Sequence, residues 1–193
     1  MKFTDVDHNG VINEKDKGMI GDPNPDFTLG ANLTVGYKGF DLNVSLHGAF
    51  GQQIARSYRK FGDGRHENYT TEVYGRWYGE GTSDKLPRLT AGTNANYMNI
   101  SDLFIENGDY LKAQNISVGY DFKKLFPKMP LTQARVYVTA QNLFTITSYK
   151  GIDPEIGYSP TNSSNTTDNW ASGIDVGFYP SPITYLVGVN LKF

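Results

Sequence analysis

The sequence has no cysteine among its 193 residues. This excludes disulfide bonds, thiolate catalysis and metal sites with cysteine ligands. Its 18 basic and 20 acidic side chains give a formal net charge of -2. A chain so close to neutrality lacks the basic face that binding to nucleic acid requires, so we expect no nucleic-acid partner.

Long apolar runs are missing as well. None approaches the roughly 18 residues of a membrane-spanning helix, and hydropathy on its own therefore favours a soluble protein. That indication is weak because the strands of membrane barrels alternate their apolar residues with polar ones. The start of the chain has no basic region followed by an apolar core, so it is not a secretion signal. We expect either a cytoplasmic chain or a native N-terminus that lies elsewhere.

Catalytic motifs are equally scarce. The sequence contains no nucleophile elbow, no Walker loop and no HExxH pattern. The three histidines, His8, His47 and His66, are far apart in the sequence. The acidic residues are scattered, and none of their pairings stands out as a glycosidase pair. We therefore expect that the protein is not an enzyme.

What the sequence does have is alternation of apolar and polar residues. Five segments show it, at about 27–37, 40–50, 112–122, 134–144 and 183–193. A period of two is typical of β-strands, whose successive side chains point to opposite faces. Glycine and tyrosine, with 21 and 13 residues, add to this pattern. The sequence predicts an all-β chain with five antiparallel strands.

The length of these segments distinguishes two all-β architectures. Soluble sandwich strands also alternate, but they usually span about 5–6 residues, whereas a tilted strand needs about 9–11 to cross a bilayer. Aromatic residues stand at both ends of the apolar rows, as in the girdles of membrane barrels. The connections alternate between short (38–39 and 123–133) and long (after Phe50 and after Phe144). We favour five strands of an outer-membrane barrel that place the C-terminus on the periplasmic side.

Two alternatives stay open. One is a secreted, calcium-stabilised β-sandwich that binds glycan through its loop aromatics. The other is a chain whose strands fold back and pair their apolar faces, as in a sandwich.

Five strands cannot close a barrel, and hydrocarbon cannot satisfy two open sheet edges. The barrel hypothesis therefore requires further strands from a longer polypeptide.

The segment 5–16 fits the template of an EF-hand calcium loop. Oxygen ligands fall at the template's positions in a set of five residues, Asp5, Asp7, Asn9, Val11 (through its carbonyl) and Asp16. Gly10 stands where the chain turns sharply, and Asn13 could act through water. Aspartate at the last position is shorter than the usual glutamate, which weakens bidentate closure. A solvated turn rich in Asp and Asn is the alternative. The sequence predicts a structural calcium ion within a loop region, 1–26, that precedes the barrel segment 27–193.

Aromatic residues in the long connections are candidate ligand contacts. Trp77, Tyr78 and Trp170 lie outside the strands, near Asn, Asp and Arg residues. Such faces suit stacking on sugar rings, and they equally suit packing within an extracellular loop. Packing is the stronger interpretation.

Several sequence blocks in one order resemble the C-terminal region of the SusC/RagA family of TonB-dependent outer-membrane transporters. The blocks are 5–16 with 21–27, 37–42, 87–89, 101–111, 115–120, 135–144, 149–155 and 173–193. The most telling is 140–144, Ala-Gln-Asn-Leu-Phe, which follows the strand pattern of 135–138. Leu103 departs from the arginine that such sequences commonly carry.

The resemblance implies the last five strands of a 22-stranded, plugged barrel with long extracellular loops and no plug domain in this chain. It implies import of glycans or peptides across the outer membrane of a Gram-negative bacterium. The implied partners are TonB, a SusD-like surface lipoprotein, outer-membrane lipid and the remaining N-terminal barrel and plug of the same transporter. The aromatic residue Phe193 would end the strand that the barrel-assembly machinery reads. This chain alone should be inactive in transport.

Overall fold

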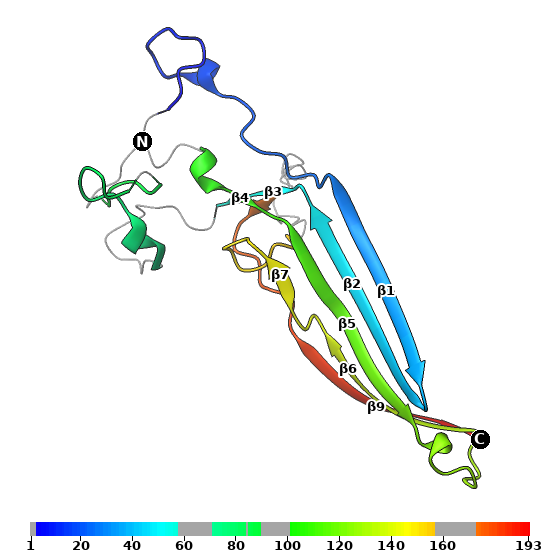
Figure 1. Ribbon diagram of the computed structural model, residues 1–193. Helices are drawn as coiled ribbons and strands as arrows, with labels where there is room; N and C mark the ends of the chain where they lie inside the picture. The colour runs from blue at the N-terminus through cyan, green and yellow to red at the C-terminus, as the bar shows by residue number, and fades with distance from the viewer. Residues whose placement is uncertain (1–2, 58–70, 84, 90–100, 157–172) are drawn as a thin grey trace, which may run out of the picture.

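The computed structural model describes residues 3–57, 71–83, 85–89, 101–156 and 173–193. Within these ranges the chain has β-strands and short 3-10 turns and no α-helix. Five long strands dominate (Figure 1): β1 (Phe27–Tyr37), β2 (Phe40–Phe50), β5 (Tyr110–Asp121), β6 (Gln133–Gln141) and β9 (Thr184–Lys192). The all-β, antiparallel architecture predicted from alternation is confirmed.

The long strands form one sheet in the order β1-β2-β5-β6-β9, and every neighbouring pair is antiparallel. Strands that are consecutive among these five are therefore neighbours in space. The tight turn Lys38-Gly39 joins β1 to β2, and both of its residues have positive φ, 48° and 97°. Positive φ at both central residues is the geometry whose twist matches a hairpin.

The strand boundaries differ from the predicted ranges at β5, β6 and β9. The largest difference is at the predicted strand 134–144, since β6 ends at Gln141. Asn142 has a φ of 53°, which turns the chain out of the strand. The next residues form β7 (Thr145–Thr147), which pairs with the start of β5. Phe144 therefore lies between two strands and does not continue the apolar row of β6.

A bulge explains why the alternation of β5 is faint in the sequence. The register with β2 shifts between Ser45 and Leu46, because Asn115 opposes the first and Ala113 the second. Gln114 is thus an extra residue that reverses the parity of the strand. Ala113 and Ile116 consequently lie on the same face of the sheet. In a regular strand, residues three positions apart would lie on opposite faces.

A small second sheet lies at one end of the long strands. It consists of β3 (Gln53–Arg56), β4 (Ile105–Asn107) and β8 (Ile174–Asp175), in the order β4-β3-β8. Figure 1 shows it near the upper ends of β2 and β5, away from the C-terminus. Ile54 and Asp175 are the largest fully buried side chains of the described residues. The two largest fully buried side chains of the described residues therefore lie at this end of the molecule.

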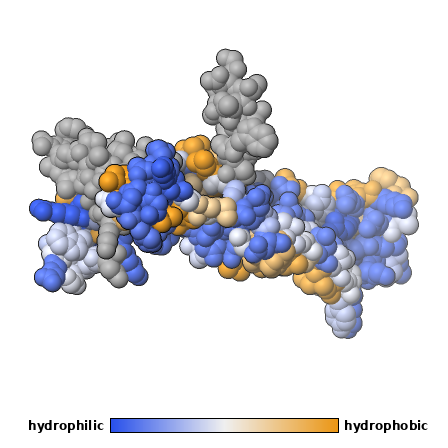
Figure 2. Space-filling view, turned by 90° about the horizontal axis from the view of Figure 1, so that it is seen from above, coloured by the Kyte–Doolittle hydropathy of each residue, from blue (hydrophilic) through white to orange (hydrophobic). Residues whose placement is uncertain are grey.

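One face of the long-stranded sheet exposes a continuous apolar row. Leu33 is 56%, Val138 49% and Val187 75% exposed. In the space-filling view, apolar surface extends along the strands beside hydrophilic surface (Figure 2). No second sheet covers this row among the described residues, and the strands do not fold back on one another. The architecture therefore disfavours both the sandwich and the fold-back alternatives. None of the helical turns described is long and apolar enough to span a membrane.

Candidate functional sites

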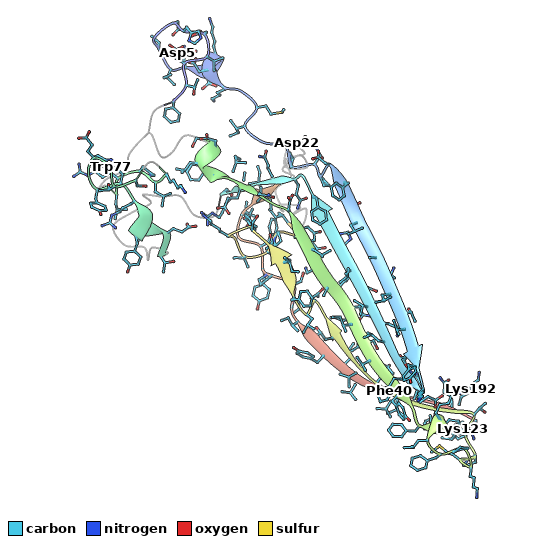
Figure 3. All side chains as sticks on the ribbon, viewed as in Figure 1. Asp5, Asp22, Phe40, Trp77, Lys123 and Lys192 are labelled. Atoms are coloured by element: carbon cyan, nitrogen blue, oxygen red, sulfur yellow. The ribbon has the colours of Figure 1, made fainter. Side chains whose placement is uncertain are left out.

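The predicted calcium loop brings three carboxylates together at the N-terminal end of the chain. One oxygen each from Asp5, Asp7 and Asp16 lies within 4.8 Å of the others. Gly10 has a φ of 80°, which allows the sharp turn between them, and the 3-10 turn Glu14–Asp16 carries Asp16 back toward the start of the loop. Figure 3 shows this loop, labelled at Asp5, projecting beyond the sheets.

Backbone amides hold these carboxylates in place. Asp5 accepts hydrogen bonds from the N–H groups of Asn9 (3.2 Å) and Gly10 (2.7 Å). Asp16 accepts from the N–H groups of Asn13 (2.7 Å) and Val6 (2.9 Å). These last two bonds hold the pKa of Asp16 below its ordinary value of 3.8, because they stabilise the ionised carboxylate.

The other two predicted ligands make hydrogen bonds within the loop. The Asn9 side-chain oxygen accepts from the Val11 N–H at 2.7 Å, and the Val11 carbonyl accepts from the Asn13 side-chain amide at 3.0 Å. Each oxygen has a second lone pair. The set of oxygen atoms, with three carboxylates, fits a hard divalent cation.

The predicted aromatic contacts lie in a loop beyond the small sheet. Trp77 is 37% and Tyr78 70% exposed. The Trp77 backbone N–H donates to the Leu86 carbonyl at 2.9 Å, and the Tyr78 backbone N–H donates to Thr82 Oγ1 at 3.0 Å. The backbone around both rings is therefore fixed while Tyr78 faces solvent. Trp170 lies outside the described residues.

Three ionic clusters were not predicted from the sequence. On the polar face of the long sheet, Arg135 of β6 binds Asp41 of β2 through two hydrogen bonds, Nε to Oδ1 at 2.8 Å and Nη2 to Oδ2 at 2.5 Å. The guanidinium reaches across β5 at Gly119, where a Cβ would lie 2.6 Å from it. The alternation in the sequence places both Asp41 and Arg135 on the polar face of their strands. Only the order of the strands in the sheet shows that the two residues meet.

A buried lysine marks the other end of the same strands. Lys112 of β5 is 4% exposed and its Nζ lies 2.5 Å from Glu155 Oε2 and 3.6 Å from Asp153 Oδ2. A buried ammonium without such partners would carry a large desolvation penalty. The pair therefore ties the segment after β7 to the long sheet.

The third cluster lies around the small sheet. Arg56 of β3 contacts Glu72 at 3.2 Å and Glu106 of β4 at 3.1 Å. Close by in the same sheet, the buried Asp175 of β8 accepts a hydrogen bond from the Tyr149 hydroxyl at 2.6 Å. These bonds join residues that are up to 50 positions apart in sequence, as in Arg56 with Glu106. They organise the end of the molecule where the long connections meet.

Comparison with known structures shows what the sheet resembles. The RagAB peptide importer in its open-open state matches with a TM-score of 0.63 and 23% identity, over 88% of this chain and 17% of that chain. Its closed-closed state gives a TM-score of 0.63 and 24% identity. The chain thus has the fold of a segment of this importer.

Sequence comparison gives the relatives. TonB-dependent receptor P3 of Formosa agariphila is 36% identical over 193 residues, which cover 99% of this chain and 19% of the relative. TonB-dependent receptor SusC of Bacteroides thetaiotaomicron is 32% identical over 193 residues, 99% of this chain and 17% of the relative. No family model matches.

The chain is therefore homologous over its whole length to TonB-dependent receptors of the SusC/RagA type, as its sequence blocks indicated. It spans about a fifth of the length of the curated relatives that it matches. These relatives and structural neighbours are receptors and transporters, not enzymes.

Proposed function

We propose that this chain forms five neighbouring wall strands of a TonB-dependent nutrient importer in the outer membrane of a Gram-negative bacterium. The observation that carries the proposal is the exposed apolar row on strands of 9–12 residues. Strands of this length suit a tilted bilayer crossing. Aliphatic side chains exposed on one face suit contact with lipid, and the polar opposite face suits a barrel interior.

The homology supports a more detailed version of the same proposal. The five strands are the last of a 22-stranded barrel whose earlier strands and plug belong to the same polypeptide. TonB supplies the energy through that earlier part, and a SusD-like lipoprotein covers the extracellular side. The cargo is a glycan or a peptide, and a transporter reduced to this chain should import neither.

The first experiment is to find the native size and compartment of the polypeptide that contains residues 1–193. Membrane and soluble fractions are blotted with an antibody against residues 184–193. We expect a heat-modifiable outer-membrane band several times heavier than 21.5 kDa. A soluble band of 21.5 kDa alone would contradict the proposal and would return attention to the secreted glycan-binding alternative.

We also propose that the loop 5–16 binds a structural calcium ion. Asp5, Asp7 and Asp16 would provide carboxylate oxygens, and Asn9 and Val11 would add carbonyl oxygens. The ion would neutralise three clustered negative charges and hold this projecting loop in one conformation. The closeness of the three carboxylates supports this role.

Terbium luminescence or calorimetry with the full-length protein tests this site. Asp5→Asn and Asp16→Asn should each weaken calcium binding at least about tenfold, which corresponds to about 1.4 kcal/mol. Each substitution removes one of the three carboxylate charges that would bind the ion. Glu14→Gln is a matched control. It removes one negative charge from the same loop, but Glu14 pairs with Lys17 at 2.5 Å and lies outside the cluster. Equal losses in all three variants would indicate a general charge effect and no defined site.

For ligand contact, we propose that Trp77 and Tyr78 offer aromatic faces to a sugar ring, with Trp170 as a further candidate. Their fixed backbone and the exposure of Tyr78 support this role. Binding of malto-, xylo- and cello-oligosaccharides to the full-length protein is measured for Trp77→Ala and Tyr78→Ala. Tyr179→Ala, which removes another aromatic ring that is 91% exposed, is the control. Unchanged binding in the first two variants would assign them to loop packing.

A further inference from the structure

The end of the sheet that has the short connections is unusually basic. Residues 38–41, 121–135 and 190–193 contain six basic side chains, at Lys38, Lys123, Lys124, Lys128, Arg135 and Lys192, and two acidic ones, Asp41 and Asp121. The whole chain, by contrast, has a net charge of -2. Figure 3 shows Lys123, Lys192 and Phe40 together at this end, far from the Asp5 loop. We call Lys38, Lys124 and Lys128 the basic rim.

Neither acidic side chain at this end forms an ion pair with a lysine of the basic rim. Asp41 is bound to Arg135 on the polar face. Asp121 Oδ1 accepts hydrogen bonds from the backbone N–H groups of Lys123 (3.0 Å) and Ala134 (3.2 Å). The structure gives none of the three rim lysines an ion pair with a described residue, and all three are exposed. Their charge is therefore available to a partner.

The rim is built into the fold and is more than a set of mobile surface lysines. The Asp121 N–H donates to the Gly39 carbonyl at 2.8 Å, which joins the two short connections. Lys124 packs its Cβ and Cγ against Gly39. A Cβ added at Gly39 would lie 3.1 Å from Lys124 Cβ and 3.2 Å from Lys124 Cγ. Lys38 Nζ lies 5.2 Å from the centre of the Tyr37 ring. Backbone and stems of two of the lysines are thus fixed side by side.

The connection between β5 and β6, which contains the third rim lysine, Lys128, is held by hydrogen bonds within itself. Lys123 Nζ donates to the carbonyl oxygens of Pro127 at 2.9 Å and Met129 at 2.7 Å. The 3-10 turn η4 (Phe122–Lys124) continues with the Phe126 N–H donating to the Phe122 carbonyl at 2.9 Å. Lys128 therefore projects from a structured turn.

Exposed apolar side chains border the rim. Tyr37 and Phe40 end the apolar row of β1 and β2 and are 67% and 58% exposed. Leu125 and Phe126, in the same turn as Lys124 and Lys128, are 56% and 53% exposed. Lysine ammonium groups beside aromatic and aliphatic side chains match the level where lipid headgroups meet acyl chains.

We propose that the basic rim binds the phosphate of an anionic phospholipid in the leaflet on this side of the membrane. The apolar residues contact the upper acyl chains while Lys38, Lys124 and Lys128 contact the headgroup. The site selects net negative charge, because zwitterionic headgroups bring an ammonium that the lysines repel. This inference rests on the proposed membrane-spanning function.

Spin-labelled lipids test the site in the full-length protein reconstituted in phosphatidylcholine vesicles. The fraction of motionally restricted label is compared for phosphatidylglycerol and phosphatidylcholine at low and high salt. We expect a preference for phosphatidylglycerol, with roughly fivefold as the upper bound for each lysine near a headgroup. The preference should disappear in K38Q/K124Q/K128Q, persist in K38R/K124R/K128R and weaken at high salt.

The matched control is K15Q/K17Q/K85Q, which removes three exposed lysines far from the rim and should leave the preference unchanged. Equal restriction of both lipids in the wild-type protein would overturn the proposal and would favour a soluble or protein partner for the rim. An undiminished preference in K38Q/K124Q/K128Q would overturn it too. Absence of any restricted lipid would instead contradict the membrane-spanning function itself.

Discussion

Gly119 is the position where a single methyl group should break a bond between two other strands. It lies on β5 opposite Asp41 of β2 and opposite Tyr137 of β6. A Cβ at Gly119 would lie 2.6 Å from both Nε and Nη2 of Arg135 and 2.6 Å from Asp41 Oδ1. In Gly119→Ala the guanidinium therefore has to swing away, and both of its hydrogen bonds to Asp41 are lost.

The size of the effect follows from two opposing contributions. A hydrogen bond to a charged group contributes about 1.5–3 kcal/mol, but this pair is 18% and 28% exposed, so solvent screening reduces the total for the pair to about 1–2 kcal/mol. Replacing glycine by alanine within a strand stabilises it by about 0.5–1 kcal/mol. We expect Gly119→Ala to lower the free energy of unfolding by about 0.5–1 kcal/mol.

Gly30→Ala is the control for the backbone contribution. Gly30 also lies within a strand, on the polar face of β1 opposite His47, and a Cβ there meets no atom within 4 Å. This variant should gain about 0.5–1 kcal/mol. The two variants should therefore differ by about 1–2 kcal/mol, the contribution of the Asp41–Arg135 pair.

Equilibrium unfolding of the full-length protein in lipid vesicles, with guanidinium chloride as the denaturant, measures these differences in the free energy of unfolding. A double-mutant cycle with Asp41→Asn identifies their cause, because Gly119→Ala should no longer cost stability once the ion pair is already weakened and should approach the gain expected of Gly30→Ala. The reasoning is wrong if Gly119→Ala is as well tolerated as Gly30→Ala. It is also wrong if its cost stays the same in the Asp41→Asn background.

Three further predictions concern other parts of the chain. Thr139→Val should cost about 1 kcal/mol, since it leaves the buried Ser117 hydroxyl without its partner at 2.9 Å, and adding Ser117→Ala should restore much of the stability in the same unfolding assay. Lys112→Met removes the ammonium that binds Glu155 and Asp153. The segment after β7 should then be held less firmly, and trypsin should cleave faster after Lys150. An unchanged cleavage rate would show that these ion pairs do not hold the segment. Asp16 has a lowered pKa in the folded loop, so its stabilising contribution is present above pH 3.8 and is lost as pH falls below that value. The amides of residues 5–16 should therefore be protected from hydrogen exchange, after correction for intrinsic rates, from pH 7 to about 4. Asp16→Asn should remove this pH dependence.

How far the sequence predicts the fold depends on whether the regularity is local. The strands 27–37 and 40–50 match β1 and β2 because their alternation is unbroken and a two-residue turn joins them. Alternation gave a weaker signal in β5 because the extra residue Gln114 reverses its parity. It continued too far in β6 because Asn142 leaves the strand through its backbone conformation, which its side-chain pattern does not reveal.

The same distinction applies to the candidate sites. The carboxylates of the loop 5–16 were found from their spacing, since a short loop brings together residues that are near in sequence. The contacts of Arg56 with Glu72 and Glu106 could not be found in this way. They depend on where β3 and β4 meet, and no local pattern specifies that.

The two faces of the long sheet are held in different ways, and this difference fits a wall between lipid and a polar interior. On the polar face, side chains bond across strands, as in Thr34 to Asn43 at 2.9 Å and Ser45 to Asn32 at 2.7 Å. On the apolar face, aromatic pairs meet at the ends of the strands, such as Phe27 with Phe50 at 5.0 Å between ring centres.

Since lipid offers no hydrogen bonds, the lateral bonds that hold the wall in register have to lie on the polar face or in the backbone. Substituting an aliphatic residue such as Leu33 by asparagine should therefore impair membrane insertion, with little effect on the register of strands. Gly119→Ala, by contrast, should lower the free energy of unfolding through loss of the Asp41–Arg135 bonds and leave membrane insertion largely unchanged.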